Sequence, residues 1–205
     1  MIPEKVMSII EETVQTEGGF VNDPLDAGGA TNFGITQKTF SDFIGRSATA
    51  DEIENMALEA AVEIYFENFW KKNKVERLPE PLQHHYFDCL VQHGPRNSGR
   101  IHQQSAVNRR RLKPEEVDGI VGSGTLAAVQ PLTLTHGLIE RVMFYANLGF
   151  DGSSYLKRNN QVRFLVGWMT RAFEFIRRDE RAKVLAEIEA EAKAEQEARY
   201  GDAND

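Results

Sequence analysis

Glu17 is the side chain best placed to do chemistry in this chain. Upstream of it, Val6, Ile10 and Val14 recur at the spacing of a helix. Glu17 follows three positions later and so falls on the same apolar face. The glycine pair 18–19 is suited to end that helix, which puts the carboxylate at the negative end of the helix dipole. Partial burial and this dipole both favour the protonated acid, the form that can protonate the leaving oxygen of a glycosidic bond.

A glutamate before two glycines is also the ordinary polar end of a helix, so Glu17 alone leaves a structural role open. The segment after it, residues 22–36, favours chemistry. It is dense in turn-forming residues and predicts a β-hairpin rather than a helix. Folded back over the helix end, this hairpin would form a cleft and offer it a carboxylate (Asp26), a hydroxyl (Thr31) and an amide (Asn32).

The run from Glu17 to Thr36, EGGFVNDPLDAGGATNFGIT, resembles the signature of glycoside hydrolase family 108, the lysozyme-like muramidases of phages and bacteria. Its order of Glu, then Asp, then Thr also resembles that of the small phage lysozymes. The resemblance implies that Glu17 is the proton donor. It further implies that Asp26 positions water or stabilises an oxocarbenium-like transition state, and that the Thr31 hydroxyl orients water.

The resemblance covers most of the chain. Tyr65, Phe69 and Trp70 lie where the family has a helix ending in Tyr and Trp. Shorter motifs resemble a predicted peptidoglycan-binding domain that commonly follows: Asp118–Gly122, Thr125–Leu126, Arg141, Phe144–Tyr145 and Phe164–Trp168. Two departures leave the fine substrate contacts open, because Val91–Gly94 replaces a Val-Asn-x-Gly pattern and Ser123 replaces a proline.

The predicted substrate-binding residues gather around the same turn. Sugar rings pack on aromatic faces, and Phe33 beside the turn is the predicted sugar contact. Gly29, Asn32 and His93 are expected to complete the binding cleft. The aromatic residues of segment 65–70 stand at helical spacing and are predicted to be core instead.

The fold is predicted to be mainly α, a lysozyme-like helical fold with a small β-hairpin next to the active-site helix. The predicted helices cover residues 3–16, 37–44, 49–70, 81–92, 97–111, 123–130 and 135–148, with a last helical stretch from residue 160. Thr49 and Glu52 have the spacing of a capping box. We expect a lysozyme-like catalytic region (1–95), a peptidoglycan-binding helical region packed on it (96–178) and a charged helical tail (179–205).

Composition excludes several classes of partner. The 205 residues are 41% hydrophobic and 27% charged, which is typical of a globular protein with one sizeable core or two small ones. A net charge of −7 argues against nucleic acid as the main ligand. No stretch is apolar enough for an integral membrane segment, and no secretory signal is evident. We therefore expect synthesis in the cytoplasm and action on the wall in the periplasm or outside, reached through a holin lesion, a secretion system or a virion.

Neither a metal nor another cofactor is expected. The five histidines show no metal-ligand spacing with a supporting carboxylate. The single Cys89 excludes an internal disulfide and is predicted to be a buried apolar residue. The tail has too few apolar heptads for a coiled coil, so a monomer is expected.

The expected function is that of a lysozyme-type glycoside hydrolase, an endolysin that cleaves peptidoglycan glycan strands. The linkage, the β-1,4 bond between N-acetylmuramic acid and N-acetylglucosamine, is implied by the resemblance. A lytic transglycosylase or a chitinase-like glycosidase on the same fold stays open, as does a non-catalytic wall-binding or virion structural protein. Sequence leaves open whether the reaction inverts or retains configuration, since that depends on the distance between Glu17 and Asp26.

Overall fold

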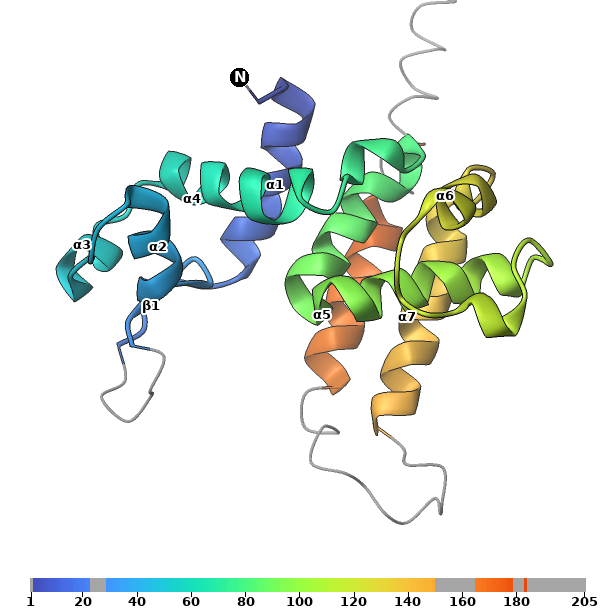
Figure 1. Ribbon diagram of the computed structural model, residues 1–205. Helices are drawn as coiled ribbons and strands as arrows, with labels where there is room; N and C mark the ends of the chain where they lie inside the picture. The colour runs from blue at the N-terminus through green and yellow to red at the C-terminus, as the bar shows by residue number, and fades with distance from the viewer. Residues whose placement is uncertain (1, 23–28, 150–164, 179–182, 184–205) are drawn as a thin grey trace, which may run out of the picture. The chain divides into compact units, whose positions relative to one another are not determined.

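The computed structural model (Figure 1) describes residues 2–22, 29–149, 165–178 and 183. The chain divides into two compact units, Met1–Leu132 and Thr133–Asp205. As predicted, it is mainly helical with a small two-stranded antiparallel sheet. The division after Leu132 differs from the functional boundaries predicted at residues 95 and 178, which remain a prediction.

The described elements are helices, with one tight hairpin between the first two of them. In the first unit they are α1 (Glu4–Thr16), β1 (Thr31–Asn32), β2 (Ile35–Thr36), α2 (Gln37–Ile44), α3 (Ala50–Glu54), α4 (Leu58–Tyr65), the π-helix η1 (Phe66–Lys71), the 3₁₀-helix η2 (Val75–Arg77), α5 (Glu80–Val107), the 3₁₀-helix η3 (Pro114–Glu116) and α6 (Ser123–Val129). The second unit contains α7 (Leu134–Gly149) and a helix over residues 165–178. None of the described helices combines the length and apolar character that a membrane crossing requires.

α1 carries Glu17 at its C-terminal end, as the sequence predicts. Ile10 and Val14 are fully buried along one face of the helix. Glu17 keeps helical backbone angles and donates its N–H to the Val14 carbonyl at 3.1 Å. Gly18 then has a φ of +96°, which a residue without a Cβ adopts at little cost. Glu17 is therefore the residue that caps the C-terminal end of α1.

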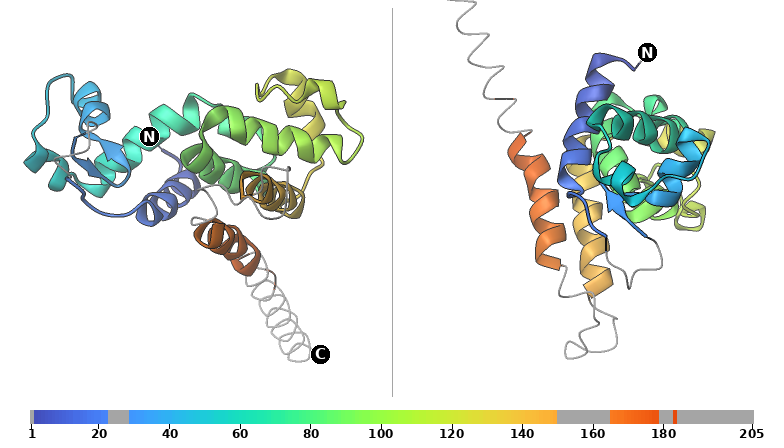
Figure 2. Two further views of the ribbon diagram at one scale, coloured as in Figure 1. Left: turned by 90° about the horizontal axis from the view of Figure 1, so that it is seen from below. Right: turned by 90° about the vertical axis from the view of Figure 1, so that its left-hand side faces the viewer.

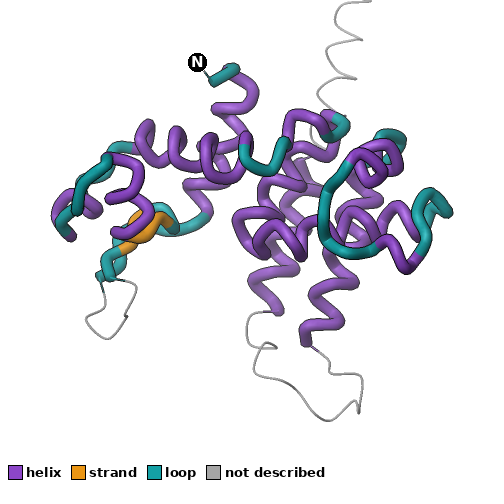
Figure 3. Tube along the Cα trace, in the orientation of Figure 1, coloured by secondary structure: helices purple, strands orange, loops and turns teal. Residues whose placement is uncertain are grey.

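A tight hairpin follows (Figure 3). β1 and β2 pair antiparallel, with Thr31 opposite Thr36. Between the strands, Phe33 and Gly34 have φ values of 52° and 70°, the positive pair that a type I′ turn requires. Val21 and Thr31 exchange two backbone hydrogen bonds of 2.8 Å. The hairpin is thereby tied to the segment that leaves α1.

The single helix predicted over residues 49–70 is wrong, since the segment forms α3, α4 and the π-helix η1. The capping box at residues 49–52 is confirmed. α3 ends early because the Asn32 amide donates to the carbonyls of Ile53 and Glu54, at 3.0 and 3.1 Å. In a continuous helix those carbonyls would accept N–H groups of the next turn. A side chain from the hairpin substitutes for that turn.

α5 is interrupted at Gly94, where φ is 74° and ψ is 168°. The Gly94–Pro95 pair separates two helical halves, as the sequence predicts. Two buried histidines join the halves, with 3.2 Å between His85 Nδ1 and His102 Nε2. His102 Nδ1 lies 2.9 Å from the Ser98 carbonyl and therefore carries a proton, because a carbonyl can only accept. This contact stabilises the bend between the halves.

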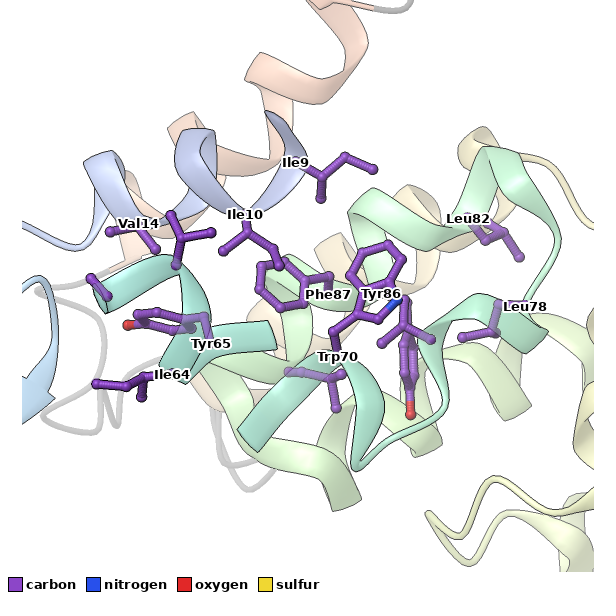
Figure 4. Packing of buried hydrophobic residues seen from close by; sticks show 14 of the residues in the cluster. Ile9, Ile10, Val14, Ile64, Tyr65, Trp70, Leu78, Leu82, Tyr86 and Phe87 are labelled. Atoms are coloured by element: carbon purple, nitrogen blue, oxygen red, sulfur yellow. The ribbon is translucent and has the colours of Figure 1, made fainter. Parts of the chain in front are cut away.

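The core of the first unit forms where α1, α4, η1 and the first half of α5 meet (Figure 4). Ile10, Tyr65, Trp70 and Phe87 are at most 2% exposed there. Phe87 contacts both other rings, with centroids 5.6 Å from Trp70 and 6.4 Å from Tyr65. Burial of side chains of this size contributes about 1.5–3 kcal/mol each. The core thereby fixes α4 and η1 against the helix that carries Glu17.

In the second unit, α7 packs against the helix over residues 165–178 (Figure 2). Leu138, Tyr145, Ala172 and Phe175 form its buried cluster. The buried Arg141 donates from Nε to the Tyr145 hydroxyl at 2.6 Å. The predicted start of the last helix near residue 160, and all of the predicted tail except residue 183, lie outside the described residues.

Candidate active site

Glu17 lies where α1 meets the hairpin turn. A Cβ placed on Gly34 would lie 3.3 Å from Glu17 Cβ and 2.8 Å from the Tyr65 hydroxyl. A glycine is therefore needed for the turn to approach this closely. The Oε1 atom of Glu17 is enclosed by protein atoms, although the residue as a whole is partly exposed. The carboxyl group thus has the half-buried position that the sequence predicts.

Tyr65 fixes the turn that packs on Glu17. Its ring is 2% exposed and stacks on Phe69 with centroids 5.1 Å apart. Its hydroxyl points away from the centre of the core (Figure 4) and donates to the Phe33 carbonyl at 2.9 Å. A positive φ is uncommon for a bulky residue such as Phe33, so this bond helps to hold the turn in a strained conformation. The core thereby positions the hairpin over Glu17.

A groove of about 330 Å³ opens beside this junction. Gly34 and Tyr65, which meet at Glu17, lie in its wall. The rest of the wall consists of Ile35, Thr39, Ile64, Asn68, Phe69, Lys72, Asn73 and Pro95. Aromatic rings pack on sugar faces, and amide groups hydrogen bond to hydroxyls. This combination suits a carbohydrate.

The π-helix η1 supplies much of the wall. Tyr65, Asn68, Phe69, Lys72 and Asn73 all line the groove from α4, η1 and the residues just after it. A π-helix is rare and is found frequently at functional sites. Its presence here favours a functional groove.

Residues 10–94 match the family model of glycosyl hydrolase 108. This part of the chain is a glycosyl hydrolase 108 domain. The match begins within α1 and ends at the Gly94 interruption of α5, so the domain contains Glu17, the hairpin and η1. The groove wall also lies within the domain except for Pro95, which follows directly.

The structure of Brucella abortus SagA is similar to this chain beyond the glycosyl hydrolase 108 domain. The two are 27% identical with a TM-score of 0.60, over 89% of this chain and 94% of that chain. No curated protein matches significantly. The fold is thus the lysozyme-like, mainly α-helical one that the sequence predicts, and residues 10–94 are those of a glycoside hydrolase family that acts on cell-wall peptidoglycan.

The structure brings part of the predicted site together. Phe33 forms the turn over Glu17, and Thr31 lies in β1 of the same hairpin, half-buried. Gly29 has a φ of +73°, and a Cβ there would lie 3.1 Å from Gln37 Oε1. Gly29 therefore begins the hairpin in a conformation that favours glycine. The catalytic candidate Asp26 lies outside the described residues.

None of the four predicted binding residues, Gly29, Asn32, Phe33 and His93, lines the groove wall, and two of them make structural contacts instead. Asn32 is 5% exposed and uses its amide nitrogen on the end of α3, which favours a structural role. His93 occupies the last helical position before the Gly94 interruption, where its carbonyl accepts from the Asn97 amide at 3.2 Å. Glu17 and Thr31 also lie outside the set of described residues that line the groove, beside it rather than in its wall.

Sequence analysis missed Gly34, Asn68, Lys72 and Asn73 as site residues. Gly34 stands inside the family signature, but its contact with Tyr65 is a tertiary feature. The polar groove residues do carry a readable signal, since they recur with two aromatic residues at helical spacing on one face. A purely apolar face would indicate core, whereas this mixed face indicates a partly solvated wall.

The described residues offer no metal site of three or more His, Cys, Asp or Glu side chains.

Proposed function

We propose that this protein is an N-acetylmuramidase that cleaves the β-1,4 bond between N-acetylmuramic acid and N-acetylglucosamine, with Glu17 as the general acid. Glu17 gives its proton to the glycosidic oxygen as the bond to the anomeric carbon breaks. Water adds to that carbon and supplies the proton that restores the carboxylic acid in the next cycle. The products are two shorter strands, one with a new reducing end.

The close approach of Gly34 to Glu17 is the observation that carries this proposal. It puts the carboxyl group between a helix end and a fixed turn, next to a groove wall of aromatic and amide side chains. Preorganised surroundings of this kind lower the reorganisation that proton transfer needs. A carboxylate that merely ended a helix would need neither the glycine nor the Tyr65 bond.

Asp26 and Thr31 are the proposed partners of Glu17. Asp26 would position the attacking water or stabilise the oxocarbenium-like transition state, and the Thr31 hydroxyl would orient that water. A separation of about 6.5–9.5 Å between the two carboxyl groups would make the reaction inverting, and about 5–5.5 Å retaining. Proton NMR of the first product formed by the wild-type enzyme distinguishes these outcomes.

The masses of the products test the assignment of the bond and the reaction. Wild-type protein incubated with isolated peptidoglycan should release muropeptides that end in reducing N-acetylmuramic acid. Anhydro-muropeptides would instead establish a lytic transglycosylase. Reducing ends on N-acetylglucosamine would contradict the proposed bond, and cleavage of chitin oligomers in preference to wall strands would favour a chitinase-like enzyme.

A non-catalytic wall-binding or virion structural protein is the remaining alternative. It predicts that the wild-type protein sediments with isolated walls but releases no soluble sugar. Residues 96–178 are the proposed wall-binding region in either case. We further propose that the enzyme acts as a monomer on the wall, in the periplasm or outside, after passage through a holin lesion or a secretion system.

A further inference from the structure

A second hollow of about 460 Å³ adjoins the groove. Both have Lys72, Asn73 and Pro95 in their walls, so they meet just after η1. The rest of this second hollow is formed by Lys74, Tyr86, Arg96 and the loop Gly119–Val121. All of these residues belong to the first unit. A strand bound beside Glu17 can therefore continue into the second hollow.

The charged side chains in the wall of the second hollow are cations. Lys72, Lys74 and Arg96 are all exposed. Neither lysine forms an ion pair with a described residue. The chain as a whole carries a net charge of −7, so this concentration of positive charge runs against the overall balance. Such a wall attracts an anionic ligand.

Asp118 lies near Arg96, but its carboxylate hydrogen bonds to Gln103 and to the backbone of the loop Gly119–Val121. Asp118 Oδ1 accepts from Gln103 Nε2 and from the Ile120 N–H, each at 2.8 Å. These bonds, that of Gln103 first, lower the pKa of Asp118, and the charge of Arg96 adds to the effect. The ionised carboxylate thus orders the loop. Lys72 and Lys74 leave the second hollow with a positive balance.

The loop is held rigidly in place. Gln103 is 1% exposed and also accepts the Gly119 N–H at 2.7 Å. A Cβ on Gly99 would lie 2.3 Å from the Gly119 carbonyl oxygen, and one on Gly119 would lie 2.7 Å from Arg96 Cγ. Backbone therefore packs on backbone, and the stem of Arg96 lies on Gly119. A preformed wall of this kind binds a ligand with little ordering cost.

Tyr86 adds a neutral donor to the cations. It is 2% exposed and lies in the wall of the second hollow. Burial raises the pKa of its hydroxyl, and the neighbouring Cys89 acts in the same direction. The hydroxyl therefore keeps its proton at neutral pH and can donate to an anionic oxygen.

We propose that the second hollow binds carboxylates attached to N-acetylmuramic acid and so selects wall glycan over neutral chitin-type polymers. The muramic acid lactyl group ends in a carboxylate or in a peptide that itself carries carboxylates, whereas chitin has none. The proposal rests on the proposed function, because the ligand is the strand that Glu17 cleaves. It assigns Lys72 and Arg96 a role in specificity rather than in bond cleavage.

Binding to the full chain carrying Glu17→Gln tests this, since the ligand then stays intact. The variant Lys72→Gln/Arg96→Gln removes two cations from the second hollow. The control Lys5→Gln/Arg77→Gln removes two exposed cations that lie outside both hollows and outside the proposed wall-binding region. Circular dichroism and thermal melts of all three proteins establish that they fold alike.

Three soluble ligands are compared by fluorescence anisotropy: peptide-bearing glycan strands, strands freed of peptide by an amidase, and chitooligosaccharides. The second-hollow variant should bind peptide-bearing strands about three- to tenfold more weakly than its parent, as expected for two exposed charge contacts. Its affinity for chitooligosaccharides, and every affinity of the control, should stay that of the parent. If affinity is also lost on peptide-free strands, the bound group is the lactyl carboxylate. If affinity is lost only on peptide-bearing strands, the bound group is a carboxylate of the peptide.

Three results would overturn the proposal: unchanged affinity for peptide-bearing strands, an equal loss on chitooligosaccharides, or an equal loss in the control. Cleavage by the wild-type protein is measured separately. Selective loss of binding without any cleavage by wild type would refute the muramidase and leave the second hollow as a carboxylate site. Cleavage by wild type together with unchanged binding by the second-hollow variant would refute the carboxylate site but not the muramidase.

Discussion

Gly34 is the residue on which the geometry around Glu17 most depends. Its φ of +70° suits the hairpin turn, and its missing side chain lets Tyr65 and Glu17 approach. Position 34 thus requires both a positive φ and the absence of a Cβ. Alanine would strain the backbone and would also push the turn away from the acid.

Gly34→Ala should therefore reduce activity more than stability. A left-handed alanine costs about 1 kcal/mol, and overpacking adds about 1–3 kcal/mol unless the turn moves. Gly45→Ala is a matched control, because Gly45 has a φ of +73° but nothing within 4 Å of its absent Cβ. Thermal melts of both variants measure the cost of backbone strain, which the two share. Wall-clearing rates show whether displacing the turn from Glu17 has a further effect in Gly34→Ala. Equal activity in the two variants would show that the contact with Glu17 is unimportant.

Glu52 provides a test of acid sensitivity at a single residue. Its ion pair with Arg46 and its bond to the Thr49 N–H lower its pKa to about 2. Because the folded value lies below the ordinary one, this stabilisation is present above about pH 5 and is lost as the pH falls toward 2. Glu52→Gln should therefore narrow the difference in melting temperature between pH 6 and pH 3. If the melting-temperature difference between pH 6 and pH 3 is the same in Glu52→Gln and wild type, the lowered pKa of Glu52 is contradicted.

At the scale of elements, the features set by local residues could be predicted from the sequence. α1, the hairpin, the capping box of α3 and the interruption at Gly94–Pro95 all arise from neighbours in the chain. The break after α3 could not, because it depends on Asn32, which lies more than twenty residues upstream of Ile53. The π-helix η1 likewise has no local signal in the sequence. The sequence prediction therefore did not include the groove, although it singled out the carboxylate beside it.

Asn32→Ala should destabilise the first unit, since it removes the side-chain donor of the Glu54 carbonyl and leaves the Ile53 carbonyl only its backbone donors. The expected loss is about 1–3 kcal/mol in the free energy of unfolding. Asn55→Ala is the control, because the exposed Asn55 amide bonds only locally to the Asp51 carbonyl. Chemical denaturation of the two variants gives the comparison. A loss in Asn32→Ala no larger than in Asn55→Ala would refute this role.

At the scale of the molecule, the glycosyl hydrolase 108 match is shorter than the compact unit that holds it. The match ends at residue 94, and the unit continues to Leu132. The loop at Gly119 joins the unit through its packing on Gly99 and the buried Gln103. The sequence motif at residues 118–122 marks this loop, but nothing in the sequence indicates that it packs on Gly99 and Gln103. Cleavage and recognition of the strand are thus proposed to share one unit.

The most direct measurement is the rate at which Glu17→Gln releases reducing ends from isolated peptidoglycan. Glu63→Gln, which alters an exposed carboxylate on α4 outside the groove wall, is the matched control. Loss of a general acid should lower the rate about a hundredfold or more, with the melting temperature and wall binding retained. The control should match wild type. A Glu17→Gln enzyme as active as wild type would contradict the central claim, that the carboxyl group beneath the hairpin turn protonates the bond that breaks.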